Sequence, residues 1–367
     1  MKIPMLDLHA QYEALMPEIR RQLDKVFASH HYIMGAQVKE FEEKMQGYLG
    51  IKHAIGCASG TDALVLAVKA LQIGQGDEII TTPFTFFATA SSIWRNHARP
   101  VFVDIDPKTF NLDPSKIEAA ITPNTKAIMP VHLFGQCSDM PAIMDIARRH
   151  NLKVIEDNAQ GIGSTWDNKM SCSFGDIGTL SFFPSKNLGA MGDAGMCLTN
   201  DDDLAAALRQ LRVHGEGPKY YHKCVGLNSR LDTVQAAVLL VKLDHLAAWS
   251  KARRANAAFY DRHLAGIDGL TTPYIDPKAQ TIYNQYTLIA SRRDELMQHL
   301  KKKDLACAVY YPLPLHLQEC FSEMGGKQGD MPVSEELAEK VLSIPIYPEL
   351  TEDMQQYVVD SITEFYR

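Results

Sequence analysis

Short apolar runs alternate with helical patterns between about residues 50 and 200, and this alternation restricts the fold more than any other feature of the chain. Apolar residues recur at three- and four-residue spacing in helical segments such as 63–71 and 140–150. Five runs read as buried strands: 78–81, 101–104, 127–131, 154–157 and 179–183. The pattern predicts an α/β fold whose mainly parallel central sheet is flanked by helices on both faces.

The chain after this region has a different organisation. A long amphipathic pattern over 233–263 predicts a connecting helix or a bent pair of helices. Strands at 286–289 and 307–310 are expected beyond it, together with helices at 293–302 and 353–366. We therefore expect a large domain over residues 1–245 and a smaller C-terminal α+β domain over residues 246–367.

Composition and charge exclude little, because an anionic small molecule could still bind a local basic pocket, but they give no indication of a nucleic-acid or membrane partner. Hydrophobic residues make up 46% of the chain and charged residues 22%, which is typical of a globular protein. A net charge of −7 provides no general attraction for nucleic acid or for an anionic membrane, so neither is expected as a partner. Neither a targeting segment nor a run of membrane-spanning length is present, and the expected location is the cytoplasm.

The seven cysteines are scattered and none forms a Cys-x-x-Cys pair. This usage indicates reduced thiols rather than a disulfide framework or a structural zinc site. No metal is therefore expected.

Lys186 follows an apolar strand and lies in a turn of small residues punctuated by proline and glycine. A lysine that forms a Schiff base needs such a partly desolvated position, because burial lowers the pKa of the amine. Chemistry with pyridoxal 5′-phosphate (PLP) also needs an aspartate that keeps the pyridine nitrogen protonated, and Asp157 ends an upstream strand. For either residue alone, a turn-capping lysine and a helix-opening aspartate are the commoner interpretations.

A phosphate site is indicated where a helix begins near residue 60. Gly60 and Thr61 lie at this start, where free N–H groups and the helix dipole favour an anion. Plain N-capping by Ser59 or Thr61 needs the same residue types and remains open. Ser181 could add a hydroxyl to the phosphate, although it could equally be a small core residue.

Two residues are candidates to flank a flat cofactor ring. Phe86 lies in a turn that holds three aromatic residues after a buried strand, and an aromatic face can stack on such a ring. Gln160 follows Asp157 by three positions and could contact the other side. The alternatives are a core aromatic cluster and a solvated glutamine.

The order of these signals along the chain makes the sequence recognisable. It resembles the fold type I PLP enzymes, and specifically the DegT-type nucleotide-sugar aminotransferases, over nearly its whole length. The Lys186 motif together with Asn228-x-Arg230 is highly specific to that family. The matching segments are 4–8, 32–35, 59–64, 83–86, 156–160, 181–189, 192–195, 228–232 and 311–316.

The resemblance implies a PLP site. Lys186 would form the Schiff base and Asp157 would pair with the pyridinium. The remaining cofactor contacts would be Gln160 and Phe86 on the ring, with Gly60, Thr61 and Ser181 on the phosphate.

The resemblance also implies a second subunit and a sugar site. Asn228 would reach the phosphate of the neighbouring subunit's cofactor, so that a homodimer with shared active sites would be needed for activity. Arg230, Tyr311 and His316 match positions near the sugar or nucleotide. For Arg230, a surface ion pair with Asp232 is the alternative.

The implied reaction moves an amino group from L-glutamate to a ketone of a nucleotide-linked sugar. The motifs look most like those of enzymes that aminate C3 of a UDP-2-acetamido-3-keto-uronic acid in surface-polysaccharide or amino-sugar biosynthesis. The alternatives are a dTDP-linked 3- or 4-ketosugar aminotransferase, an α-amino-acid aminotransferase and a non-catalytic PLP-sensing regulatory protein. Related sugar dehydratases carry histidine where this chain has Lys186, which argues against dehydration.

Overall fold

A seven-stranded sheet forms the centre of the molecule in the computed structural model, which describes residues 1–367. Its strand order is β1-β9-β8-β5-β4-β2-β3. All neighbours run parallel except that β9 is antiparallel to both β8 and β1, so the predicted mainly parallel sheet is confirmed. The strands are β1 His53–Cys57, β2 Glu78–Thr81, β3 Arg99–Phe102, β4 Thr125–Met129, β5 Lys153–Asp157, β8 Ile177–Ser181 and β9 Gly195–Thr199.

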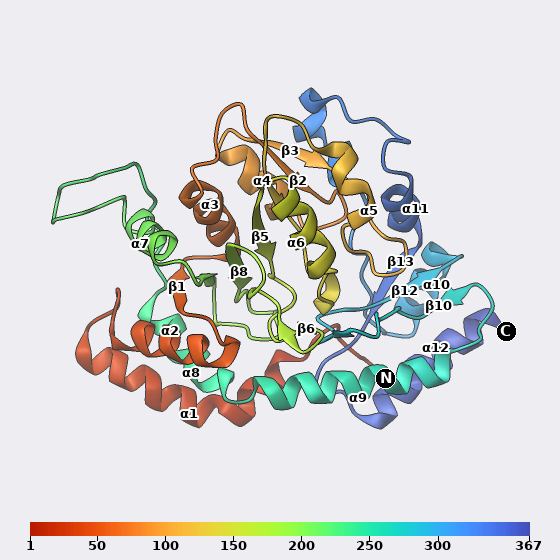
Figure 1. The fold of residues 1–367 in the computed structure, drawn as a ribbon. Coiled ribbons are helices and arrows are strands. Elements are labelled where there is room, and N and C mark those ends of the chain that lie inside the picture. The colour runs from red at the N-terminus through yellow and green to blue at the C-terminus, as the bar shows by residue number, and fades with distance from the viewer.

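Helices cover both faces of this sheet, because successive residues of its strands point to opposite sides (Figure 1). Ile79 and Ile155 face the helices over residues 60–70, 88–95 and 202–211, whereas Ile80 and Val154 face the helix over residues 140–149. The helices that flank the sheet are α2 Ala36–Leu49, α3 Gly60–Ala70, α4 Ala88–Arg95, α5 Pro114–Ile117, α6 Met140–Arg149, α7 Asp202–Leu211 and α8 Thr233–Leu243.

Two strands of the sheet, β1 and β9, were not expected from the sequence. Both are buried almost throughout and contain glycine and cysteine, so they show neither alternation nor a β-branched run. Strand β3 also begins two residues earlier than the expected 101–104 and includes Pro100. Proline is tolerated there because β3 is an edge strand, with one side free of ladder hydrogen bonds.

The long amphipathic pattern over 233–263 is a bent pair of helices. Helix α8 ends at Leu243, and α9 runs from Leu246 to Leu264. Figure 1 shows α9 leading away from α8 along the lower edge of the molecule to α12 (Glu352–Tyr366), against which it packs.

A second sheet of three antiparallel strands lies beyond α9, in the order β10-β12-β13. The expected helix at 293–302 is confirmed as α10. The elements of this part are β10 Leu270–Thr271, β12 Tyr286–Ala290, α10 Arg293–Lys302, α11 Pro332–Lys340, β13 Val341–Ile344 and α12. The N-terminus joins this unit, because Ile3 pairs with Leu305 and packs in the same core.

The prediction of a strand at 307–310 is wrong. Only Ala308 forms a bridge, through two backbone hydrogen bonds with Ser343. Val309 and Tyr311 instead turn toward a cluster around Phe84, where they bury apolar surface rather than extend the ladder.

The remaining elements are helix α1, a small sheet and four short 3₁₀ helices. They are α1 Leu8–Ser29, β6 Thr165–Trp166, β7 Lys169–Met170, β11 Ala279–Gln280, η1 Glu118–Ala120, η2 Leu133–Gly135, η3 Leu315–Leu317 and η4 Glu319–Met324. None of the helices combines the length and the apolar character that crossing a membrane requires.

Candidate active site

The candidate cofactor residues gather at the carboxyl ends of neighbouring central strands. Asp157 is the last residue of β5, and Ser181 is the last residue of the adjacent parallel strand β8. Lys186 lies in the loop that follows β8. In open α/β sheets this edge is where ligands bind.

Asp157 is a buried carboxylate without an ion-pair partner. Thr89 donates a 2.7 Å hydrogen bond from Oγ1 to Oδ2, and the Ala159 N–H donates one of 3.2 Å to Oδ1. Burial raises the pKa of Asp157, while these two hydrogen bonds and the nearby charge of Lys186 act to lower it. A buried carboxylate of this kind is suited to a cationic ligand group.

Lys186 presents an amine that makes no hydrogen bond or ion pair. Its backbone N–H donates to the Phe183 carbonyl at 2.8 Å, which tightens the loop, and its side chain is half-buried. Burial lowers the pKa of Lys186 to about 8, against the opposing effect of Asp157. The neutral fraction of this amine near physiological pH is therefore larger than that of an ordinary lysine, and the neutral form is the one that attacks an aldehyde.

The start of α3 offers unused N–H groups beside Ser181. Ser59 caps the helix by accepting a 3.1 Å hydrogen bond from the Asp62 N–H, whereas the Gly60 and Thr61 amides have no acceptor in the protein. A Cβ added at Gly60 would lie 2.6 Å from the Cβ of Ser181. Capping and an anion cradle thus coexist, on different residues.

Three candidate residues, Gln160, Tyr311 and Phe86, lie in contact and form one wall of the site. Gln160 Oε1 accepts a 2.8 Å hydrogen bond from the Phe134 N–H, and its Nε2 donates one of 3.0 Å to the Tyr311 hydroxyl. The Tyr311 and Phe86 rings are 6.4 Å apart. Phe86 is 57% exposed whereas Phe84 is fully buried, so the core interpretation applies to Phe84.

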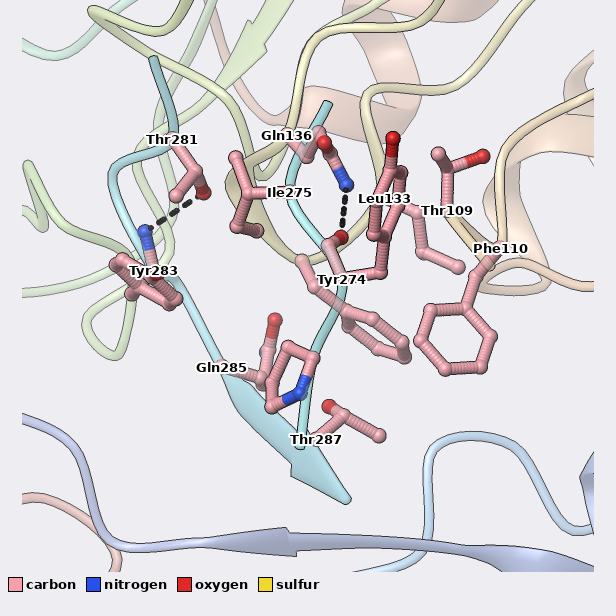
Figure 2. A pocket seen from close by; sticks show the side chains of 12 residues that line it. Thr109, Phe110, Leu133, Gln136, Tyr274, Ile275, Thr281, Tyr283, Gln285 and Thr287 are labelled. Carbon is pink, nitrogen blue, oxygen red and sulfur yellow. Dashed lines mark hydrogen bonds between the residues drawn. The ribbon is translucent and has the colours of Figure 1, made fainter. Parts of the chain in front are cut away.

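Figure 2 shows a small cavity where Gln136 donates a 3.1 Å hydrogen bond to the Tyr274 carbonyl beside Leu133 and Phe110. Phe134, whose backbone N–H donates to Gln160, also lines this cavity. The volume of the cavity is about 20 Å³, which suits a single water molecule. It cannot hold a cofactor.

Asn228 and Arg230 line a larger pocket of about 490 Å³. Arg230 forms no ion pair with Asp232, and its buried Nε has no hydrogen-bond partner. Asn228 is exposed. The ion-pair alternative for Arg230 is therefore not what the structure shows, and its guanidinium is free to bind an anionic group.

His316 lies against the edge strand β3. Its Nε2 is 3.0 Å from Glu335 Oε1, and its ring meets the edge of Phe102. It lines a separate pocket of about 270 Å³ along β3. Neither of its side-chain partners is a candidate site residue, so the structure does not join it directly to the set.

Thr89 contacts the candidate site and was not among the residues expected from the sequence. Its hydroxyl is also 3.1 Å from that of Thr85, so two buried hydroxyls lie in series behind Asp157. The only indication in the sequence was that Thr89 follows Phe87 of the aromatic turn by two positions. Nothing in the sequence connected Thr89 to Asp157.

A buried histidine–carboxylate pair beside Asp157 was missed as well. Glu156 accepts hydrogen bonds from His132 Nε2 at 3.0 Å and from the backbone amides of Cys172, Phe174 and Gly175. The Ser138 N–H donates to His132 Nδ1 at 3.1 Å, which assigns the ring proton to Nε2. The backbone N–H of His132 also donates to the backbone carbonyl of Asp157, so the His132–Glu156 pair supports the end of β5.

These residues fit PLP. The free amides of Gly60 and Thr61 beside Ser181 suit its phosphate, the unpaired Asp157 suits its pyridinium, and the unpaired Lys186 amine suits its aldehyde. The space for this phosphate beside Ser181 exists because residue 60 is a glycine and carries no Cβ.

Residues 14–363 match the DegT/DnrJ/EryC1/StrS aminotransferase family. A pleiotropic regulatory protein of Geobacillus stearothermophilus is 54% identical over 369 residues, covering 100% of this chain and 99% of the relative. The UDP-N-acetyl-3-dehydro-α-D-glucosamine 3-aminotransferase of Acidithiobacillus ferrooxidans is 47% identical, covering 96% and 94%. The UDP-2-acetamido-2-deoxy-3-oxo-D-glucuronate aminotransferase of Pseudomonas aeruginosa is 43% identical, covering 95% and 96%.

Solved structures agree in fold over the whole chain. DesV of S. venezuelae, crystallised with a ketimine intermediate, superposes with a TM-score of 0.98 at 39% identity and covers 100% of this chain and 99% of that one. NtdA of Bacillus subtilis, with the bound cofactor pyridoxamine phosphate (PMP), superposes with a TM-score of 0.92 at 32% identity. The match covers 100% of this chain and 85% of NtdA.

Proposed function

This chain belongs to the DegT/DnrJ/EryC1/StrS aminotransferase family, and from this premise we propose that it transfers an amino group from L-glutamate to C3 of a UDP-linked 2-acetamido-3-ketosugar. One observation carries the chemical part of this proposal. The unpaired amine of Lys186 and the unpaired buried carboxylate of Asp157 lie at the carboxyl ends of adjacent strands, beside an anion cradle.

When bound, PLP supplies an aldehyde for amine exchange and an electron-withdrawing ring that stabilises negative charge at the reacting carbon. Lys186 would then take the proton from the α-carbon of the amino donor, and later deliver one to the sugar carbon that becomes aminated. Asp157 would hold the proton on the pyridine nitrogen. Gly60, Thr61 and Ser181 would anchor the phosphate, while Phe86 and Gln160 would fix the plane of the ring.

Arg230 is the residue proposed to bind an anionic group of the nucleotide-linked sugar. Its guanidinium has no ion-pair partner and lines an open pocket, and a planar guanidinium suits a sugar carboxylate or a diphosphate. Tyr311 would contact the sugar from the wall formed with Gln160. His316 would act from the edge of β3, where Glu335 orients its ring.

A homodimer with shared active sites is part of the proposal. Figure 1 shows the loop between α7 and α8 projecting away from the rest of the molecule. Large apolar residues on this loop and around the site are exposed, among them Tyr32, Ile33, Phe86, Phe183, Tyr220 and Val225. A second copy would cover this surface, and Asn228 would reach the phosphate in the partner's site.

The chain would divide near residue 245 into a large PLP-binding domain and a small C-terminal domain. The break between α8 and α9 supports this boundary. The crossing of Ile3 into the small core would tie the N-terminal arm to the second domain.

The test incubates the PLP-loaded protein with L-glutamate and follows the change of cofactor absorbance. Retained steady-state aminotransfer by Lys186→Ala or Lys186→Arg would remove the assigned role of the lysine. A panel of UDP- and dTDP-linked 3- and 4-ketosugars, including UDP-2-acetamido-3-ketoglucose and its uronic acid, then identifies the acceptor. Exclusive turnover of 4-ketosugars would overturn the C3 assignment.

A regulatory function is the second candidate, because a relative at 54% identity is named a pleiotropic regulatory protein. Both functions are compatible with PLP binding, so binding alone does not separate them. Conversion of PLP to pyridoxamine phosphate by L-glutamate, followed by amination of a ketosugar, supports the enzyme. PLP binding without that conversion supports the regulator.

A further inference from the structure

Lys242 on α8 is a lysine without exposed surface and without a salt bridge. Its Nζ lies 4.5 Å from the centre of the Tyr12 ring and 5.8 Å from that of Trp249. Its one hydrogen bond, of 3.3 Å, goes to the Tyr12 hydroxyl. A methionine or leucine would fill this space at less cost, so the charge itself calls for an explanation.

The hydrogen bond continues from Tyr12 to the loop that carries Lys186. The Tyr12 hydroxyl donates to the carbonyl of Ala190 at 3.1 Å. The Ala190 N–H in turn donates to the carbonyl of Phe182 at 2.8 Å, which closes the loop over residues 182–190. Lys242, Tyr12 and Ala190 therefore form a polar chain from the inside of α8, through α1, to the end of this loop.

Lys242 determines the donor-to-acceptor direction of these hydrogen bonds. An ammonium group has three donors and no acceptor, so Tyr12 must accept from Lys242 and direct its only proton to Ala190. Burial lowers the pKa of Lys242 to about 8, with Glu349 opposing the shift, and the ammonium form still prevails at pH 7. An apolar residue at this position would leave the Tyr12 hydroxyl free to rotate.

A second contact from α8 secures the residue after Ala190. Gln235 accepts a 2.9 Å hydrogen bond at Oε1 from the Met191 N–H. On the other side of the loop, Asn187 donates to the carbonyl of Ile282 at 3.1 Å. The loop is thus held from both sides, and the contact through Tyr12 is the one that depends on a buried charge.

We infer that Lys242, acting through Tyr12, is a positioning residue that holds the loop over residues 182–190 and so the amine of Lys186. Its importance for the reaction rests on the proposed function, whereas its effect on the loop does not. Tyr12→Phe removes the hydroxyl, and Lys242→Met removes the charge at similar volume. Tyr260→Phe is the control, because it removes another tyrosine bond to a carbonyl, that of Pro345, in the small core.

Hydrogen–deuterium exchange of residues 182–190, measured with and without PLP, is the first readout. Loss of one hydrogen bond corresponds to a change of about fivefold in opening, so Tyr12→Phe should speed exchange in this segment by about that factor. Lys242→Met should speed it less, and Tyr260→Phe not at all. If Tyr12→Phe does not fold, Lys242→Met tests the same loop.

The double variant decides whether Lys242 acts through Tyr12. Adding Lys242→Met to Tyr12→Phe should leave both the exchange rate and the midpoint of the pH titration of PLP absorbance where Tyr12→Phe alone puts them. Additive effects, or unchanged exchange in Tyr12→Phe, overturn the inference. Because exchange without PLP does not require Schiff-base formation, failure of the proposed function would leave this result intact.

Discussion

The Thr89 hydroxyl donates a 2.7 Å hydrogen bond to Oδ2 of Asp157, the carboxylate at the end of β5. The contact joins the start of α4 to the centre of the sheet. Burial raises the pKa of Asp157, and the hydrogen bond from Thr89 acts in the opposite direction, so this contact favours the ionised carboxylate that a pyridinium would need.

Thr89→Val should weaken PLP binding and turnover by roughly tenfold, the cost of a hydrogen bond to a charged group. The bond from Thr89 acts to lower the pKa of Asp157, so its loss raises that pKa further and favours the neutral acid. A neutral acid pairs poorly with a pyridinium. Thr89→Ser keeps a hydroxyl and should recover most of the affinity in an absorbance titration, and equal losses in both variants would refute the explanation.

The apo-protein should capture PLP faster as the pH rises through about 8. The neutral amine is the nucleophile, and burial lowers the pKa of Lys186, so the neutral fraction grows below the range of an ordinary lysine. Stopped-flow absorbance across a pH series measures the midpoint. A midpoint near that of a free lysine would contradict the lowered pKa, and Lys186→Arg should show no such phase.

Gly60→Ala should cost about 1–3 kcal/mol of unfolding free energy, because its Cβ would lie 2.6 Å from the Cβ of Ser181. It should also weaken PLP binding by displacing the phosphate cradle. Gly47→Ala in α2 is the matched control, since a Cβ there meets nothing within 4 Å and should stabilise the helix by up to about 1 kcal/mol. Urea unfolding of the two variants compares them, and equal stability would show that Ser181 yields without cost.

Mixing inactive Lys186→Ala and Asn228→Ala proteins should restore activity. If Asn228 serves the partner's site, a mixed dimer holds one site with both residues intact. Random exchange of equal amounts should then give about a quarter of wild-type turnover. If both residues serve the same subunit's site, mixing restores nothing.

The chemistry of this protein could be predicted from the order of its motifs. Strand β2 and helix α10 have the bounds that apolar spacing predicts, because one buried face imposes its period on the sequence. Lys186, Asp157 and the start of α3 were predicted as cofactor residues from their residue types, from their places after or at the end of a strand or at a helix start, and from their order along the chain.

Tertiary structure alone decided which of these residues meet. The sequence left Ser59 and Thr61 equal as caps, and only the folded helix start shows Ser59 bonded to Asp62 with the amides of Gly60 and Thr61 free. It also left Arg230 open to an ion pair that does not form.

The contacts Thr89–Asp157, Gly60–Ser181 and Lys242–Tyr12 join segments far apart in the chain. They exist because the parallel sheet brings the ends of several strands to one edge, and because α1 packs beside α8. A period in the sequence records which face of an element is buried. It does not record which distant element covers that face, and this is why the residues behind the site emerged only from the structure.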